Sequence, residues 1–364
     1  MKIKYYQPLF LAIILMLPFT INAQNTEPSS KVDLSEINNR IESMSYDITS
    51  LQKAVDDLAW YNRVGDMAYI DKVFITGPPV AESKIKNPTA MGARNPVKFY
   101  SYIFIPKNLN PDKKYPLLVL PHGGVHGDFT TYHTHIIREL IAQQYIVIAP
   151  EYRGSSGYGK DFYEKIDYGG LENDDVNASR NYMVRNYDMV DSTRVGIIGW
   201  SHGGMIALMC VFDHPEWYNV CFAGVPVSDL ISRMGYSDDE YRKLFSAGYH
   251  LGKDARENIL EYRKRSPAWN AQKLKTPLLI HTNTNDDDVN VLEVEHLIKS
   301  LKAEGKSFEY EIFKEVEGGH SFDRIDTRTA KEIRLKIYAF LDKYLNPPKK
   351  LKRIDDINKA AYRE

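Results

Sequence analysis

The chain has 364 residues, 43% of them hydrophobic and 26% charged, which is enough to bury the core of one large domain with an appendage. Basic and acidic residues nearly balance, 47 against 48. Because no basic stripe is available to hold a polyphosphate backbone, we expect no nucleic-acid partner.

The first 23 residues are predicted to form a secretory signal peptide. Lys2 and Lys4 precede an uncharged apolar stretch at residues 8–21, and a cleavage site is expected after Ala23. This stretch is shorter than the ~20 residues that span a bilayer. An uncleaved anchor is the alternative. We expect a secreted or periplasmic protein, with no stable membrane insertion once the signal is removed.

The two cysteines, Cys210 and Cys221, lie in apolar segments. Such positions are more typical of core residues than of a disulfide or a metal site, although the sequence leaves a bond between them open. We therefore expect no disulfide framework, no metal and no cofactor.

Residues 34–58 are predicted to form a helix with one continuous apolar seam. Its members are separated alternately by three and four residues: Leu34, Ile37, Ile41, Met44, Ile48, Leu51, Val55 and Leu58. This is the repeat of a coiled coil, although a helix packed on its own domain has a similar period. We assign residues 24–76 to a helical extension, and expect a homodimer through residues 34–58. Residues 77–98, rich in Pro, Gly and Lys, are assigned to a loop.

Residues 99–346 are predicted to form one α/β domain, and residues 347–364 a polar tail. Short apolar runs rich in β-branched and aromatic residues indicate strands at 99–106, 115–121, 145–150, 194–200, 220–226, 277–282 and 308–313. Helix-length segments lie between most of them. This alternation predicts a mostly parallel sheet with helices on both faces, and ligands then bind at the carboxyl edge of the strands.

Ser201 lies in the sequence "GWSHG", which fits Gly-x-Ser-x-Gly between a predicted strand and a predicted helix. In such a nucleophile elbow the glycines avoid clashes in a strained turn that exposes the hydroxyl. The alternative is a tight turn with an incidental serine. The elbow predicts an α/β-hydrolase fold with Ser201 as nucleophile.

A serine nucleophile needs a base and an acid, which in this fold follow later strands in the order Ser, Asp, His. His320 follows the last predicted strand, after Gly318 and Gly319. Asp286, Asp287 and Asp288 follow the strand before it, and we select Asp286. For the oxyanion hole we expect backbone N–H groups of His202 and of Gly123 or Gly124 in "PHGGVHG". Tyr236 and Tyr241 are candidates for an acyl pocket, although they could equally be packing residues.

The motifs "HGG", "PEYRGSSGYG", "GWSHGG", "NDDDV" and "GGHSF", in this order, resemble the catalytic domain of the prolyl oligopeptidase family of serine peptidases over residues 99–345. The resemblance implies Ser201, Asp286 and His320 as the triad, because the family aspartate precedes the valine at position 289 by three residues. The family's β-propeller has no counterpart in the residues before the first strand, and His202 replaces a tyrosine found in many members. We expect a peptidase that forms an acyl-enzyme. The alternative is a carboxylesterase acting on acylated sugars or other small esters.

Overall fold

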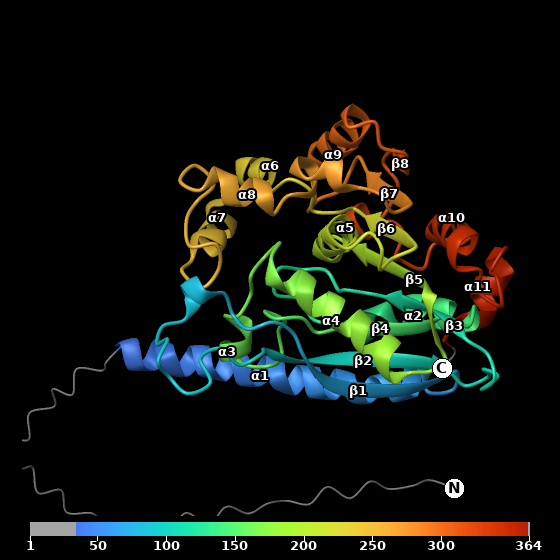
Figure 1. Ribbon diagram of the computed structural model, residues 1–364, viewed down its shortest axis with the longest axis horizontal. Helices are drawn as coiled ribbons and strands as arrows, with labels where there is room; N and C mark the ends of the chain where they lie inside the picture. Colours follow the sequence, from blue (N-terminus) through green and yellow to red (C-terminus); the bar gives the residue numbers. More distant parts are fainter. Residues whose placement is uncertain (1–33, 363–364) are drawn as a thin grey trace, which may run out of the picture. The chain divides into compact units, whose positions relative to one another are not determined.

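The computed structural model describes residues 34–362, which belong to two units, residues 1–41 and 42–364. Of the first unit, the described part is the start of helix α1 (Leu34–Val64). The second contains the rest of α1 and all the other elements (Figure 1). The predicted signal peptide lies outside the described residues.

The centre of the second unit is an eight-stranded sheet with the order β1-β2-β4-β3-β5-β6-β7-β8. The pairs β1–β2 and β2–β4 are antiparallel and the other five are parallel, so the prediction of a mostly parallel sheet is confirmed. The strands are β1 (Ala68–Thr76), β2 (Lys98–Pro106), β3 (Tyr115–Val119), β4 (Ile146–Pro150), β5 (Val190–Trp200), β6 (Val220–Gly224), β7 (Leu278–Asn283) and β8 (Glu309–Phe313).

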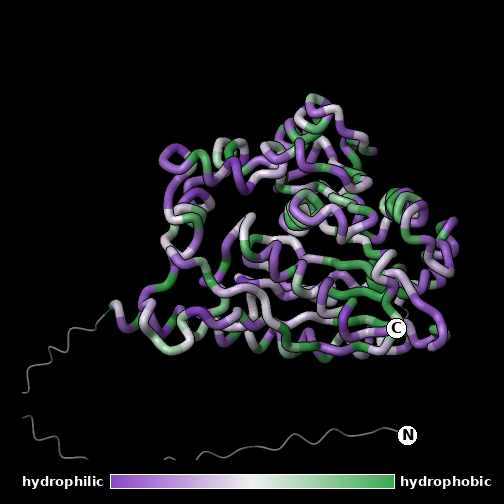
Figure 2. Tube along the Cα trace, in the orientation of Figure 1, coloured by the Kyte–Doolittle hydropathy of each residue, from purple (hydrophilic) through white to green (hydrophobic). Residues whose placement is uncertain are grey.

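Two hydrophobic clusters cover the two faces of this sheet. Leu117 and Val119 of β3 join one cluster and Leu118 joins the other, as the two-residue period of a strand requires. Helices α4 (Leu171–Asn186), α5 (His202–Asp213) and α9 (Val291–Ala303) pack on the first face. Helices α2 (Thr134–Ala142), α10 (Arg328–Leu345) and α11 (Ile354–Ala360) pack on the second, with the end of α1. In Figure 2 the central parallel strands and α5 are mainly hydrophobic.

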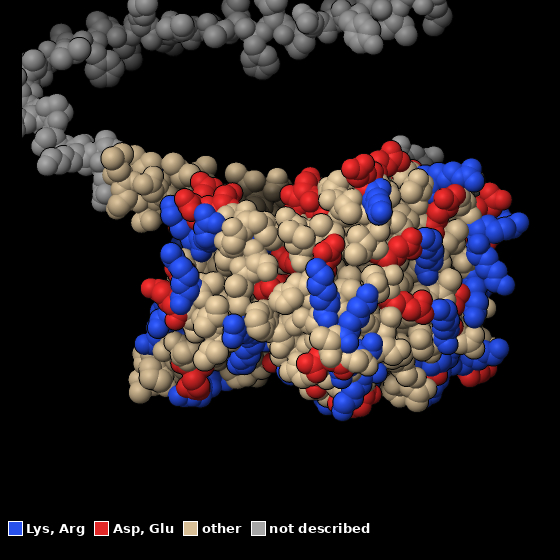
Figure 3. All heavy atoms as spheres, turned by 90° about the horizontal axis from the view of Figure 1, so that it is seen from above, with Lys and Arg blue, Asp and Glu red and all other residues tan. Residues whose placement is uncertain are grey.

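The remaining helices lie near the carboxyl edge of the sheet or in its connections. They are α3 (Lys160–Tyr163), α6 (Leu230–Tyr236), α7 (Asp239–Ser246) and α8 (Ile259–Lys264). Both cysteines are free and buried. No helix within residues 34–362 is long and apolar enough to cross a bilayer. On the face drawn in Figure 3, basic and acidic side chains are interspersed.

Two segments differ from the sequence-based assignment. Residues 68–76, which we placed in the helical extension, form the edge strand β1, and its nine residues pair with β2. The tail that we expected to be merely polar contains α11, where Ile357 and Ala360 are buried. The guanidinium of Arg138 in α2 also donates to the carbonyl of Ala360 over 2.6 Å. Both segments are short, and their stability comes from these distant partners.

Helix α1 is anchored by residues spaced seven apart on one face. The ring of Tyr46 packs edge-on against Tyr163, with centroids 5.6 Å apart. Lys53 is 3% exposed, and its ammonium lies 2.8 Å from the Glu151 carboxylate. Trp60 is fully buried and stacks on Phe129. Residues seven apart share a helix face, so this face is turned toward the domain.

The apolar seam lies on the opposite face of α1. Its eight side chains, from Leu34 to Leu58, are between 40% and 71% exposed. Within the second unit, the domain therefore leaves the seam uncovered from Met44 to Leu58, contrary to the alternative in which the seam packs along the domain.

The sharpest turn in the sheet joins β5 to α5. Ser201 occupies it with φ 60° and ψ −126°, a conformation that costs a non-glycine residue free energy. A Cβ on Gly199 would lie 2.1 Å from the carbonyl oxygen of Gly203, and a Cβ on Gly203 would lie 2.3 Å from that of Pro121. Only glycine fits at these two positions, as the elbow motif predicts.

We predict that Gly203→Ala lowers the free energy of unfolding by about 3 kcal/mol or more, because the added methyl meets a main-chain oxygen that cannot rotate away. Gly235→Ala in α6 is the matched control. A Cβ there has no neighbour within 4 Å, so it should leave stability unchanged or raise it by up to about 1 kcal/mol. Urea unfolding measures both, and equal stability of the two variants would contradict the crowded turn.

Candidate active site

Ser201 lies at the carboxyl edge of the parallel strands. It follows the last residue of β5 and precedes the first turn of α5, and the residue is only 6% exposed. Its N–H donates to the carbonyl of Gly224 over 2.9 Å, and its carbonyl accepts from the N–H of Val227 over 3.1 Å. These bonds tie the turn to the end of the neighbouring strand β6, so the position of the serine is set by the sheet.

His320 and Asp286 meet at the same edge, from the loops after β8 and β7. The imidazole Nδ1 lies 2.9 Å from each carboxylate oxygen of Asp286, whose side chain is fully buried. The Asp286 carboxylate also accepts from the backbone N–H groups of Asp288 and Val289. Gly318 and Gly319 both have positive φ and form the turn before the histidine. Asp286 is therefore the carboxylate that orients this imidazole.

The two neighbouring aspartates contact His320 differently. Asp287 is exposed and accepts from the backbone N–H of His320 over 3.1 Å. Asp288 is half exposed, and its Oδ2 lies 3.8 Å from the imidazole Nε2. Asp288 is thus near the nitrogen that Asp286 leaves open.

The glycine loop at residues 122–124 approaches Ser201 closely. A Cβ on Gly123 would lie 3.3 Å from the Cβ of Ser201. Gly124 has a positive φ of 82°, and its carbonyl accepts from the imidazole Nδ1 of His202 over 2.9 Å. The structure therefore brings together the loop and the start of α5, from which we expected the oxyanion donors.

The side chain of His202 makes buried structural contacts, in addition to the oxyanion role that we expected of its backbone N–H. Its ring is 1% exposed and stacks on Tyr168, with centroids 4.0 Å apart. Its Nε2 lies 3.2 Å from a carboxylate oxygen of Glu172, which is fully buried. His202 thus joins the glycine loop to the segment "DYGGLE" behind the nucleophile. A histidine directly after the elbow serine was the only sequence signal for this contact.

Tyr236 and Tyr241, our candidates for an acyl pocket, both bind a buried arginine. Arg233 is 5% exposed, and its guanidinium donates to the hydroxyl of Tyr241 over 2.7 Å and to that of Tyr236 over 2.9 Å. It also donates to Asp288 Oδ1 over 2.6 Å. The Tyr236 hydroxyl in turn donates to Glu293, whose pKa is raised to about 7 by burial. Sequence reasoning missed Arg233, whose only signal was a single basic residue in the largely apolar segment "LISRMGY".

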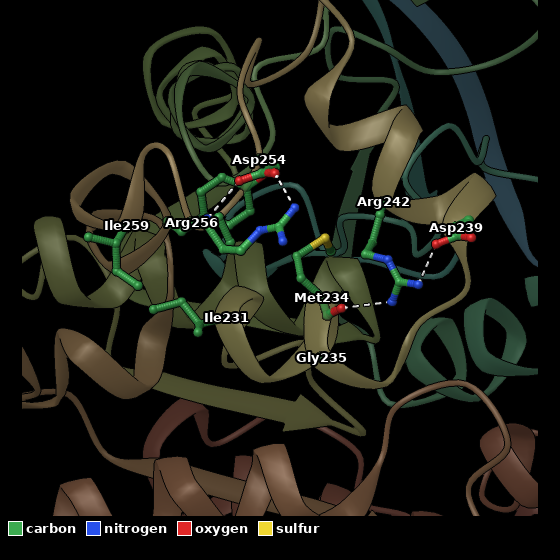
Figure 4. Close-up of a pocket in the computed structure, with 10 residues that line it drawn as sticks. Ile231, Met234, Gly235, Asp239, Arg242, Asp254, Arg256 and Ile259 are labelled. Carbon is green, nitrogen blue, oxygen red and sulfur yellow. Dashed lines mark hydrogen bonds and ion pairs between the residues drawn. The ribbon is translucent and has the colours of Figure 1, made fainter.

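A separate pocket lies beside α6 and the loop before α8 (Figure 4). Its apolar lining includes Ile231, Met234 and Ile259. The two arginines that line it pair with aspartates of the same lining, Arg242 with Asp239 over 2.6 Å and Arg256 with Asp254 over 3.0 Å. Because these charges are neutralised locally, the pocket does not extend the charged network around His320.

Known proteins resemble this chain over its α/β domain. The model of the prolyl oligopeptidase family matches residues 132–348. The uncharacterized peptidase YuxL of Bacillus subtilis is 30% identical over 207 residues, which are 56% of this chain and 31% of that protein. The acylamino-acid-releasing enzyme of Mus musculus is 28% identical over 287 residues, 76% of this chain and 36% of the enzyme. The chain thus spans about a third of the length of these relatives.

Solved structures show the same fold. An acylaminoacyl peptidase of Pyrococcus horikoshii superposes with a TM-score of 0.63 at 18% identity, covering 80% of this chain and 45% of that one. A puromycin-hydrolyzing peptidase of Mycobacterium tuberculosis superposes with a TM-score of 0.62 at 21% identity, covering 78% and 40%. The family match covers more than half of the chain, including Ser201, Asp286 and His320. The chain therefore belongs to the prolyl oligopeptidase family of serine peptidases.

Proposed function

We propose that this chain is an exported serine peptidase that cleaves peptide bonds through an acyl-enzyme. The observation that carries the proposal is the buried Asp286 carboxylate on Nδ1 of His320, at the same sheet edge as the strained Ser201. Export rests on the pattern of residues 1–23, which lie outside the described residues.

The geometry supports a defined role for each group. Ser201 attacks the substrate carbonyl while Nε2 of His320 removes its proton and later donates it to the leaving amine. Asp286 keeps the proton on Nδ1 and stabilises the imidazolium that forms. The backbone N–H of His202, with that of Gly123 or Gly124, receives the negative charge of the tetrahedral intermediate.

Peptide amides are the proposed substrates because the chain belongs to a peptidase family and because its relatives include enzymes named for releasing acylamino acids. The same groups also hydrolyse esters, so a carboxylesterase for acylated sugars or other small esters is the alternative. The two functions differ in whether amides are turned over at all.

We predict that a fluorophosphonate labels the wild-type protein at Ser201 and that Ser201→Ala abolishes the labelling. Asp286→Asn should slow labelling by about 10³-fold or more, because an amide stabilises the wrong imidazole tautomer and no imidazolium. Asp288→Asn, the matched control two residues away, should slow it less than about 10-fold. The readout is the labelling rate by mass spectrometry. Unchanged labelling of Ser201→Ala, or a larger effect of Asp288→Asn, would contradict these roles.

The exposed seam on α1 supports a second proposal, that the chain forms a homodimer through residues 34–58. Eight apolar side chains at heptad spacing are exposed on one face, whereas the opposite face is anchored by Lys53 and Trp60. An apolar seam of this length is unfavourable in contact with water, so we expect another apolar surface to cover it. Ile48, Leu51 and Val55 line a hollow along the helix, which could receive an apolar side chain from a facing helix.

A second copy of this chain is the occupant that the spacing favours. Two identical seams with a 3.5-residue repeat can interlock over their whole length, which an unrelated surface does not match. Of the six flanking positions only Arg40 and Asp47 are charged, whereas Asn38, Ser45, Gln52 and Ala54 are not, so the interface would gain little from ion pairs. We therefore propose a reversible dimer of moderate affinity.

We predict that light scattering of the signal-free protein at micromolar concentration gives the mass of a dimer. Leu51→Glu should give a monomer, because it places a charge in the interface. Ser43→Glu, an equal change of charge at an exposed helix position outside the seam, should remain dimeric. Circular dichroism checks that all three proteins are folded. A monomeric wild type, or a Leu51→Glu variant that is still dimeric, would overturn the proposal, and the former result would indicate another occupant of the seam.

A further inference from the structure

Asp288 presents one carboxylate oxygen to the base of the proposed active site. Its Oδ1 accepts from Arg233 over 2.6 Å, so this oxygen is already bound. Its Oδ2 lies 3.8 Å from Nε2 of His320, the nitrogen that faces away from Asp286. Half of the Asp288 side chain is exposed, so this carboxylate lies at the solvent-facing side of the site.

The Asp288 carboxylate is held in place by a rigid support. Arg233 is buried and is itself bound by Tyr241, Tyr236 and the backbone carbonyl of Asp288. Burial raises the pKa of Asp288, but the attraction of Arg233, the hydrogen bond from it and the nearby His320 outweigh that effect and lower the pKa. The group therefore carries its negative charge at neutral pH.

The position of this charge bears on the substrate. The attacked carbonyl carbon must lie beside Ser201 with its leaving nitrogen close to Nε2 of His320. In an aminoacyl substrate the α-ammonium is attached one carbon away from that carbonyl. The α-ammonium can therefore reach an oxygen near Nε2. An ionised carboxylate forms a stronger hydrogen bond with an ammonium than with an uncharged donor.

We propose that Asp288 binds the α-ammonium of the substrate, so that the chain prefers aminoacyl amides with a free amino terminus over N-acylated ones. Arg233 is the positioning residue that aims the carboxylate. This inference rests on the proposed peptidase function and adds the substrate class. An N-acylated residue has no cation at this place, and would desolvate the carboxylate without compensation.

The test uses the full signal-free protein with two anilides of the same residue, alanine 4-nitroanilide and N-acetylalanine 4-nitroanilide. The wild type should have the higher kcat/KM for the free amine. Asp288→Asn should lower kcat/KM for the free amine by about 10- to 100-fold, mainly through KM, because a charge-assisted hydrogen bond is lost. The value for the acetylated anilide should change less than about 3-fold, which also shows that the variant is folded. Asp239→Asn, which removes an exposed carboxylate on α7, is the control and should change neither value.

Equal losses on both anilides would overturn the inference, since Asp288 would then act through His320 or through the fold. A wild type that prefers the acetylated anilide would overturn it as well. Failure of the proposed function has a different signature: neither anilide is hydrolysed and Ser201 is not labelled by the fluorophosphonate.

Discussion

The close approach of three backbone segments at the turn after β5 determines the rest of the site. Gly203 lies against the carbonyl of Pro121, and Gly199 lies against Gly203, so none of the three segments can move without the others. The positive φ of Ser201 is maintained by this packing and by bonds to the end of β6. The same contact brings the glycine loop to the serine, so the proposed nucleophile and the proposed oxyanion loop depend on one constraint.

His320 shows how three adjacent carboxylates can have separate roles. The buried Asp286 carboxylate contacts Nδ1 of the imidazole, and Asp287 accepts from the backbone N–H of the histidine. Asp288 lies near Nε2 and is held there by its ion pair with Arg233. Mutual repulsion is limited because each carboxylate has its own partner. The proposed triad acid, Asp286, and the proposed substrate-binding carboxylate, Asp288, thus lie in one loop of the chain.

Local patterns were sufficient to predict part of this structure. The elbow at Ser201 and the place of His320 followed from motifs after predicted strands, because a parallel sheet brings such loops to one edge, whereas the selection of Asp286 among three adjacent aspartates came from the family resemblance. Strand β1 was missed because an edge strand with exposed Tyr69 and Phe74 has no clear alternation. The pairs Arg233–Asp288 and Lys53–Glu151 join residues 55 and 98 positions apart, and no local pattern reports such contacts. The seam of α1 was visible as a repeat, but its exposure depends on Lys53, a residue type that sequence reasoning places on the surface.

The central claim is covalent catalysis by Ser201 on a peptide bond, and trapping the intermediate tests it most directly. The signal-free protein is mixed with a short peptide anilide, quenched in acid within the first turnover, and mapped by mass spectrometry. The account predicts an adduct with the mass of the acyl part of the peptide, located on the fragment that contains Ser201. Release of the aniline with no covalent adduct, or an adduct on another residue, would contradict it.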